Sequence, residues 1–576
     1  MVDLKAKPFF LNDEQIAWVE GTISSMTLEE IVGQLFIYLS VSPDPAEPKR
    51  ICETYHIGGL RWQNATAEQS WEKINAFQQA SKIPLLVAAN VEGGTDKMAK
   101  SGTVIAPPPA AGAAQTDAVA YELGRIGGIE AKSVGCNWTF APISDILFNW
   151  RNTIVNNRAF GNDPDNILAC CKAYMRGMKE SDIACCTKHF PGDGVEERDQ
   201  HLIMGCNDLS IEEWDASFGR IYKELIDEGI ESMMIGHICM PAYQKKYNPS
   251  LTDADIMPAT LSPELLQNLL REQLGFNGLI LTDASHMVGM TCAAPRSEQV
   301  PGAIAAGCDM YLMFNGEPVE DFTYMLNGVK DGRISEERLS DALHRILGLK
   351  AKQGLHHFAM PAKEGISVIG CEEHLTAIRK CADESVTLVK DTQNLLPVNP
   401  SERKRVRLYY LRSPNAMTFG DPDKSKQIVI EELERVGFTV DAPDDFYEAT
   451  AKHPDDPSVA LKFFHAEPAE EFKKKFDLVM VFVNMVGYAQ ENVVRLRYST
   501  AHSNEMPWYV KEVPTLCVSL NYTTHLFDLP MMKTYINAYA SSREYIRAAV
   551  EKITGKSDFK GTANDLVWCE RWDTRI

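Results

Sequence analysis

The chain has 576 residues, of which 45% are hydrophobic and 24% are charged, a balance that excludes disordered and fibrous classes. Its formal net charge is −21, from 58 basic and 79 acidic residues, so we expect no nucleic-acid partner and no binding to an anionic membrane. The longest apolar run, Ile83–Ala89, is too short to cross a bilayer.

The 14 cysteines include two adjacent pairs inside apolar segments, Cys170 with Cys171 and Cys185 with Cys186. No CxxC or Cys/His spacing typical of a metal site is present, so we expect reduced core thiols and no metal. The N-terminus has no apolar segment of a secretory signal. No glycine-rich nucleotide motif follows a strand, and we expect a cytoplasmic protein without a cofactor.

Over the first 355 residues, short apolar runs alternate with amphipathic helical stretches. A capping box at Thr27–Glu30 opens one helix, and Ser262 with Pro263 opens another. This alternation predicts parallel βαβ units, and its repetition predicts a TIM-like (β/α)8 barrel over residues 1–355. The predicted strands are Ile83–Ala89, Trp138–Ile143, Ile183–Thr187, Ser232–Ile238, Leu279–Leu281 and Asp309–Phe314.

Residues 356–373 contain glycine and proline without sustained periodicity, which predicts a linker. The pattern then restarts over residues 374–576, with helices at Lys424–Val436 and Ser541–Ile553. The fold class is therefore α/β: a barrel followed by a smaller C-terminal α/β/α layered domain. The strands predicted in this second domain are Val406–Leu411, Leu478–Val483, Thr515–Leu520 and Thr534–Tyr539.

Polar or ionisable side chains follow five of the apolar runs in the first domain. Each alone is explained by a strand-end cap, which is the ordinary role of such residues. The C-terminal ends of barrel strands meet on one face, however, and the five together favour a single polar pocket. The residues concerned are Asn90, Asp145, Lys188 with His189, His237 and Asp283.

The segment KHFPGDGVEERDQH, residues 188–201, is the densest in functional groups. Asp199 lies two positions before His201, and a carboxylate beside an imidazole makes it a usable general acid near neutral pH. A plain surface loop is the alternative for an isolated Asp-x-His. Asp283 ends an apolar strand, where a carboxylate serves as a nucleophile, base or metal ligand; no second carboxylate accompanies it to favour a metal.

The same segment closely resembles the KHFPG-G-(x)4-D-x-H motif of family 3 glycoside hydrolases, in their β-N-acetylglucosaminidase branch. Weaker matches extend the resemblance over nearly the whole chain. They include residues 26–36, 58–59, 92–94, 137–145, 158–164, 275–283 and 306–310, and, past the linker, 384–390 and 395–397.

The resemblance implies roles for individual residues. Asp283 matches the catalytic nucleophile, and His201 matches the acid/base, with Asp199 as its orienting partner. Matches to residues that hold the sugar in the −1 subsite are Lys188, His189 and Arg158, with His237 as a further member of the pocket.

The implied activity is that of an exo-acting, retaining β-N-acetylglucosaminidase whose partner is a small carbohydrate containing GlcNAc. A neutral imidazole does not repel an anionic acceptor, so a phosphorylase is the nearest alternative, beside a β-glycosidase of altered sugar specificity. A non-catalytic sugar-binding protein is the alternative from another class. The aglycone and the oligomeric state stay open, a homodimer being one option.

One segment departs from the family pattern. Relatives typically have Asp-x-Glu-Gly-Gly-Arg where this chain has NVEGGT at residues 90–95. The resemblance implies that the aspartate accepts hydrogen bonds from hydroxyls on the far side of the −1 sugar. Asn90 keeps one acceptor oxygen, loses the charge and gains donors, which predicts altered recognition at C4 and C6. A neutral replacement compensated by water is the alternative.

Overall fold

The computed structural model describes residues 2–62, 65–314, 316–413, 424–463, 467–487, 493, 495–499 and 504–576, and the chain forms two compact units. The first unit comprises Met1–Ile105, Ala120–Phe148 and Arg158–His374, and the second comprises Ala106–Val119, Asn149–Asn157 and Leu375–Ile576. The predicted linker carries two short 3₁₀ helices, η5 (Leu355–His357) and η6 (Lys363–Val368).

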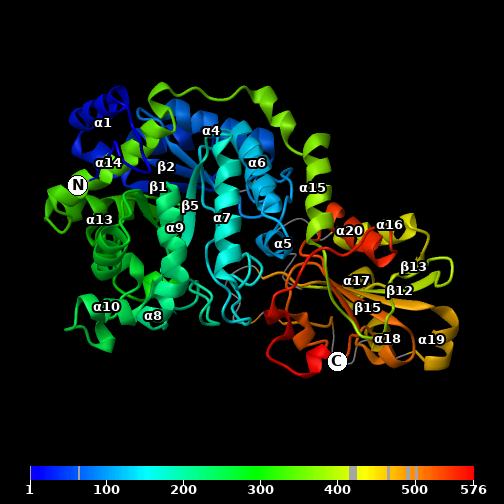
Figure 1. Ribbon diagram of the computed structural model, residues 1–576. Coiled ribbons are helices and arrows are strands. Elements are labelled where there is room, and N and C mark those ends of the chain that lie inside the picture. The colour runs from blue at the N-terminus through cyan, green and yellow to red at the C-terminus, as the bar shows by residue number, and fades with distance from the viewer. Residues whose placement is uncertain are drawn as a thin grey trace. The chain divides into compact units, whose positions relative to one another are not determined.

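An eight-stranded parallel sheet forms the centre of the first unit in its described part (Figure 1). In spatial order the strands are β10 (Tyr311–Met313), β1 (Phe36–Ser40), β2 (Gly59–Trp62), β3 (Leu86–Ala89), β4 (Trp138–Thr139), β5 (Ala184–Phe190), β7 (Ser232–Ile235) and β9 (Leu279–Thr282). The two edge strands meet, because Thr282 N donates to Met310 O at 3.1 Å and Leu281 bridges Met310. The predicted barrel is confirmed.

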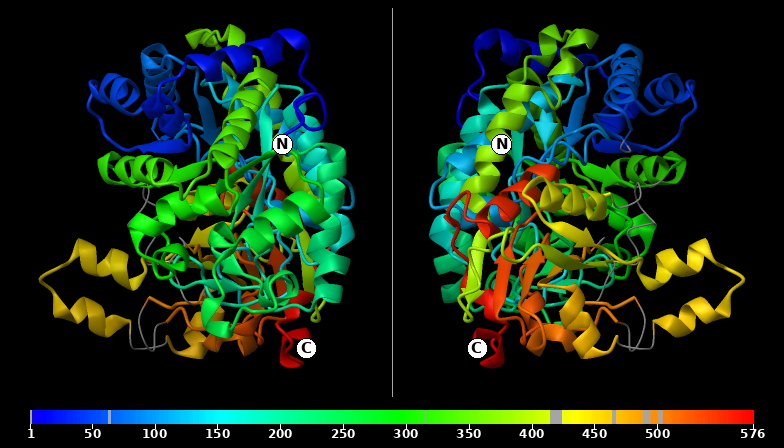
Figure 2. Two further views of the ribbon diagram at one scale, coloured as in Figure 1. Left: turned by 90° about the vertical axis from the view of Figure 1, so that its left-hand side faces the viewer. Right: turned by 90° about the vertical axis from the view of Figure 1, so that its right-hand side faces the viewer.

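Helices surround these strands, as the two side views show (Figure 2). A short two-stranded sheet pairs β6 (Gly205–Cys206) with β8 (Ile238–Cys239). β6 follows β5 in the chain, and β8 follows β7. The helices are α1 (Asp13–Ser25), α2 (Leu28–Gln34), α3 (Glu47–Tyr55), α4 (Ala67–Ala80), α6 (Ala118–Ser133), α7 (Pro164–Lys179), α8 (Ile211–Trp214), α9 (Arg220–Glu228), α10 (Pro241–Tyr247), α11 (Val288–Thr291), α12 (Arg296–Ala306), α13 (Val319–Lys330) and α14 (Glu336–Lys352).

Local sequence explains where these elements begin. The Thr27 hydroxyl accepts from Glu30 N, and the Glu30 carboxylate accepts from Thr27 N, so the predicted capping box opens α2. Ser262 and Pro263 precede helix η4 (Glu264–Gln273), close to the predicted start, and its four leucines are buried in the core. One difference concerns β5: it continues through Lys188 and His189 to Phe190, because Phe190 still pairs with Ile235 of β7 after a register shift.

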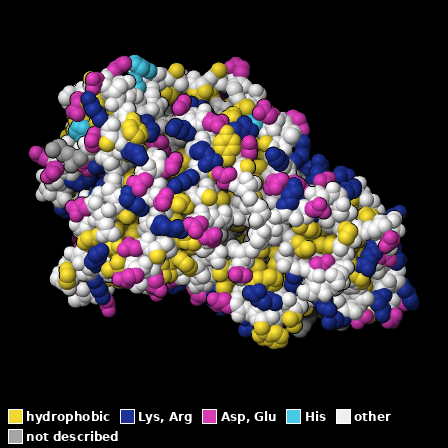
Figure 3. All heavy atoms as spheres, in the orientation of Figure 1, with side chains coloured by type: hydrophobic (Ala, Val, Ile, Leu, Met, Phe, Trp, Pro, Cys, Tyr) yellow, Lys and Arg dark blue, Asp and Glu magenta, His cyan; other side chains and the backbone are white. Residues whose placement is uncertain are grey.

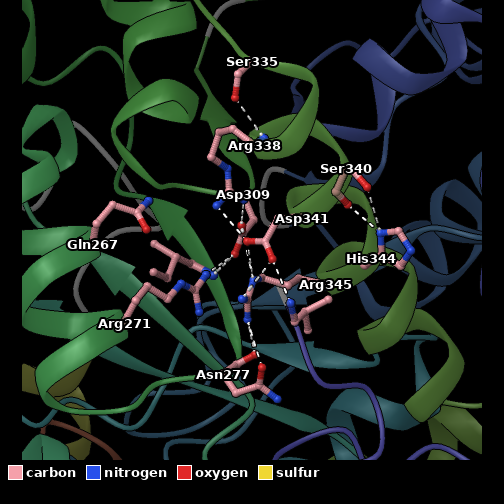
Figure 4. Close-up of polar contacts among 12 residues, drawn as sticks. Gln267, Arg271, Asn277, Asp309, Ser335, Arg338, Ser340, Asp341, His344 and Arg345 are labelled. Atoms are coloured by element: carbon pink, nitrogen blue, oxygen red, sulfur yellow. Dashed lines mark hydrogen bonds and ion pairs between the residues drawn. The ribbon is translucent and has the colours of Figure 1, made fainter.

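A buried ion network lies where β9 and β10 begin, at the opposite end of the strands from their C-terminal loops (Figure 4). Asp309 is fully buried, accepts from Arg271 at 2.7 Å and also pairs with Arg338. Arg338 and Arg345 of α14 both bind Asp341, at 2.9 and 3.1 Å. Such buried charges persist only when they are paired, so Asp309 of the 306–310 segment has a structural role here.

The second unit is built on a six-stranded sheet in its described part, parallel except for its edge strand β11. Its strand order is β11 (Thr387–Asp391), β16 (Thr534–Asn537), β15 (Thr515–Ser519), β14 (Leu478–Asn484), β12 (Arg405–Arg412) and β13 (Thr439–Asp441). The helices of this part of the chain are α5 (Pro108–Ala113), α15 (Glu372–Ser385), α16 (Ser425–Arg435), α17 (Phe446–Lys452), α18 (Pro457–Lys462), α19 (Ala469–Lys475) and α20 (Arg543–Ile553). The predicted layered α/β domain is confirmed.

On the face of the molecule seen in Figure 3, basic and acidic side chains are interspersed and apolar groups form small patches. Among the described helices, none is long and apolar enough to span a bilayer.

We expect His525 to make the stability of the second unit depend on pH. Burial lowers the pKa of His525 to about 4 from its usual 6.5, so the unfolded chain takes up a proton before the folded chain does. The free energy of unfolding should therefore fall as the pH drops from 6.5 to 4, by up to about 3 kcal/mol. Thermal unfolding of His525→Gln should show a shallower pH slope over this window. The exposed His453 provides the control, and an equal change of slope in His453→Gln would contradict the assignment.

Candidate active site

Asp283 follows the last residue of β9, at the C-terminal end of the barrel strands. Its backbone N donates to Ile235 O at 2.9 Å, which fixes it beside β7, and its Oδ1 accepts from Ala284 N at 2.7 Å. Burial alone would raise the pKa of Asp283, but the positive potential of His189, His237, His201 and Lys188 outweighs burial and lowers it to about 2. Asp283 is therefore a carboxylate, 13% exposed, at neutral pH.

His189 lies between two aspartates. Its Nδ1 is 2.7 Å from Asp145 Oδ2, and its backbone N donates to Asp145 Oδ1 at 3.0 Å. The other ring nitrogen, Nε2, is 3.9 Å from Asp283 Oδ2. The fully buried Asp145 therefore fixes the orientation of the imidazole and directs Nε2 toward Asp283.

Glu92, two positions beyond Asn90, holds two cations. Arg158 binds it through Nε and Nη2, both at 2.9 Å, and Lys188 Nζ lies 2.6 Å from Oε1. Burial disfavours the charge of Glu92, yet Arg158 and Lys188 hold its pKa well below the usual value. The three side chains form a rigid polar wall made from residues that follow β3, precede α7 and belong to β5.

The loop after β5 carries the second reactive group. His201 Nδ1 lies 2.7 Å from Asp199 Oδ1, and the same oxygen accepts from His201 N at 2.8 Å. Asp199 is buried while the imidazole is 21% exposed, so its Nε2 is the ring nitrogen left for a ligand. Val288 N and Gly289 N donate to the carbonyls of His201 and Gln200, which ties this loop to the segment after Asp283.

His237 is buried and contacts the segments that carry Asp283 and His201. Its side chain is completely buried, with Nδ1 3.1 Å from Thr260 Oγ1 and Nε2 3.0 Å from Ala284 O. Both ring nitrogens are thus engaged by the protein, and burial lowers the pKa of His237. Its backbone N donates to Gln200 Oε1 at 2.7 Å, so His237 connects the Asp283 segment with the His201 loop.

Asn90 directly follows the last residue of β3. Its Oδ1 accepts from Arg61 Nη1 of β2 at 3.3 Å. Burial lowers the pKa of Arg61, while Glu92 and Asp283 act in the opposite direction, so Arg61 lies within electrostatic reach of both.

The structure brings all eight residues proposed from the sequence into the first unit, and electrostatics link most of them to Asp283. Two further residues were missed as site members, Glu92 and Arg61, and Asp145, which the strand-end pattern placed in the pocket, was given no role there. Glu92 and Asp145 stood in segments quoted for the family resemblance, and Arg61 is a charge inside an apolar strand, a local signal that could have been used. No group of three or more His, Cys, Asp or Glu side chains within the described ranges is arranged to hold a metal.

Comparisons with known proteins show the family of the chain. The profile described as "Glycosyl hydrolase family 3 N terminal domain" matches residues 27–349. A relative from Cellulomonas fimi, named beta-N-acetylglucosaminidase/beta-glucosidase, is 36% identical over 578 residues and covers 100% of both chains. A beta-hexosaminidase of Idiomarina loihiensis is 30% identical over 294 residues, 49% of this chain and 84% of its own. A solved structure, beta-glucoside phosphorylase BglX, superposes with a TM-score of 0.89 at 36% identity, covering 97% of this chain and 98% of that one.

The barrel, with carboxylate and imidazole groups at the C-terminal ends of its strands, defines an enzyme that acts on glycosidic bonds. The chain belongs to glycoside hydrolase family 3.

Proposed function

We propose that this protein is a retaining exo-β-glycosidase of the β-N-acetylglucosaminidase/β-glucosidase type, with Asp283 as nucleophile and His201 as acid/base. The observation that carries the proposal is the pairing of an ionised, partly exposed Asp283 with a His201–Asp199 dyad whose loop is bonded to the segment after Asp283. The name of the Cellulomonas fimi relative supports the choice of sugars.

The reaction proceeds in two displacements. An Asp283 oxygen attacks the anomeric carbon, the bond from that carbon to the leaving oxygen breaks, and His201 Nε2–H donates its proton to that oxygen. A water then gives its proton to His201 Nε2, its oxygen attacks the anomeric carbon, and the bond to Asp283 breaks. Two inversions give net retention. Asp199 keeps the imidazole proton of Nδ1 in place, so that Nε2 performs both transfers.

The remaining predicted residues hold the sugar and the reacting groups. Lys188, Arg158 and His189 border the −1 subsite, with Glu92 and Asp145 fixing their positions. His237 acts as a positioning residue for the two catalytic loops, because no part of its side chain is exposed. All these residues lie within 1–355, the proposed catalytic domain; 356–373 would be the linker and 374–576 the second domain.

Phosphorolysis is the second candidate. The similar structure is described as a phosphorylase, and a neutral imidazole does not repel phosphate as a carboxylate base would. The test is turnover of 4-nitrophenyl β-GlcNAc and β-glucoside with and without inorganic phosphate. Free sugar in both conditions identifies a hydrolase, and sugar 1-phosphate formed with phosphate identifies a phosphorylase. Absence of turnover for every glycoside would identify a binding protein.

The low pKa of Asp283 has a consequence for the pH profile. The nucleophile stays ionised as the pH falls toward about 2, so no acidic limb above about pH 3 should come from it. We expect kcat/KM of the wild type for a substrate with a good leaving group to stay flat on the acid side down to about pH 3. A limb between about pH 4 and 5 would contradict the assignment.

A further inference from the structure

Arg61 is a charged residue in an otherwise apolar strand, and it reaches the site from the end of β2. β2 and β3 are neighbours in the sheet, with Gly59 opposite Leu86, and this pairing sets Arg61 beside Asn90. The guanidinium donates from Nη1 to Asn90 Oδ1 at 3.3 Å. Arg61 is neither fully buried nor fully exposed, so part of its surface is open to a ligand.

Arg61 has no direct ion-pair partner among the described residues, although Glu92 and Asp283 act on its charge from farther away. Arg158 and Lys188 both bind Glu92, but no carboxylate of the described residues lies within 4.0 Å of the Arg61 guanidinium. Its Nε is buried without a hydrogen-bond partner in the same part of the chain. An arginine has five N–H donors, and a buried cation without an anion is costly. The guanidinium donors that Asn90 does not engage therefore face the site, where an anionic acceptor on a ligand would match their charge.

The strand order tells which part of a bound sugar meets Arg61. β3 is four strands from β9 in either direction around the sheet, so Asn90 and Arg61 lie across the barrel from Asp283. Asp283 reacts at C1 in the proposed mechanism. The opposite end of the ring, which carries C4 and the C6 substituent, therefore faces Asn90 and Arg61.

We propose that Arg61, with Asn90, selects a −1 sugar that carries an anionic group on C6, either a carboxylate or a phosphate. The planar guanidinium binds such groups through two parallel hydrogen bonds. The neutral amide of Asn90 leaves this charge available, whereas an aspartate there would pair with Arg61 and repel an anion. This inference rests on the proposed glycosidase function and names its substrate class.

The test compares kcat/KM for 4-nitrophenyl β-glucoside, β-glucuronide and β-glucoside 6-phosphate. We expect the wild type to favour at least one anionic substrate about 10-fold or more over the glucoside, and the two anionic arms separate a carboxylate from a phosphate. Arg61→Met should lower the anionic rate by about 10- to 100-fold and the neutral rate less than about threefold. Asn90→Asp, which keeps Arg61, should likewise lower the preference for the anionic substrates over the neutral glucoside.

Arg50→Met is the matched control, because Arg50 of α3 is an exposed arginine already paired with Glu317, and it should leave all three rates unchanged. Thermal unfolding checks each variant, and Asn90→Asp decides if Arg61→Met does not fold. A wild type that prefers the neutral glucoside, or an equal loss on all three substrates, would overturn the inference while leaving the glycosidase function intact. If no glycoside reacts, the proposed function fails, and calorimetric binding of glucuronate and glucose 6-phosphate against glucose decides the inference by itself.

Discussion

Asp283→Ala is expected to lower kcat/KM by at least about 10⁴-fold for every glycoside that the wild type turns over. The physical reason is that, in the proposed mechanism, the glycosyl-enzyme forms by attack of the ionised carboxylate that follows β9. Neighbouring side chains cannot replace it, since Lys188 is bonded to Glu92 and His189 to Asp145.

Asp283→Asn separates charge from shape in the same experiment. The amide keeps the size of the side chain and removes the nucleophile, so its activity should fall with that of Asp283→Ala. Its folded state should also lose about 2 kcal/mol at neutral pH, because the pKa of the carboxylate is lowered from 3.8 to about 2. That stabilisation is present above pH 3.8 and is lost as the pH falls toward 2. Residual activity above about 1% after exclusion of contaminating enzyme would contradict the role of Asp283.

His201→Ala is expected to act selectively on leaving groups. Substrates whose leaving oxygen needs a proton should lose about 10²–10⁴-fold in kcat/KM, while an activated nitrophenyl glycoside should lose much less in its first step. The measurement is a series of aryl glycosides of graded leaving-group pKa, with the slope compared between wild type and variant. Equal losses across the series would argue against proton donation by His201.

Asp199→Asn tests the same imidazole through its partner. Asp199 Oδ1 accepts hydrogen bonds from the ring Nδ1 and the backbone N of His201. The asparagine amide should therefore weaken the dyad and, like His201→Ala, slow substrates with poor leaving groups most. In the double variant with His201→Ala the two losses should fall far short of adding. Asp208→Asn, in the same connecting segment but outside the dyad, is the control. Additive losses would show that Asp199 acts independently of His201.

Much of the fold could be predicted because its signals are local. Caps such as Thr27 with Glu30, and the alternation of short apolar runs with amphipathic helices, depend on residues a few positions apart. The strands β12, β14, β15 and β16 therefore appeared close to where they were expected. The 188–201 motif likewise carries Asp199 and His201 in one continuous segment, and their contact followed from two-residue spacing.

Only the tertiary structure decided which side chains meet between different strands and loops of the barrel. Arg158 meets Glu92 across 66 positions of sequence, and Arg61 meets Asn90 across 29. Such pairs depend on which strands are neighbours in the sheet, and hydrophobic periodicity does not reveal the order of the strands. The same holds for His237: its position after an apolar run suggested a pocket residue, but packing of Thr260 and Ala284 against both ring nitrogens placed it behind the pocket. Sequence alone thus determined which groups end the strands, and the sheet order determined which of them face one another and with what charge.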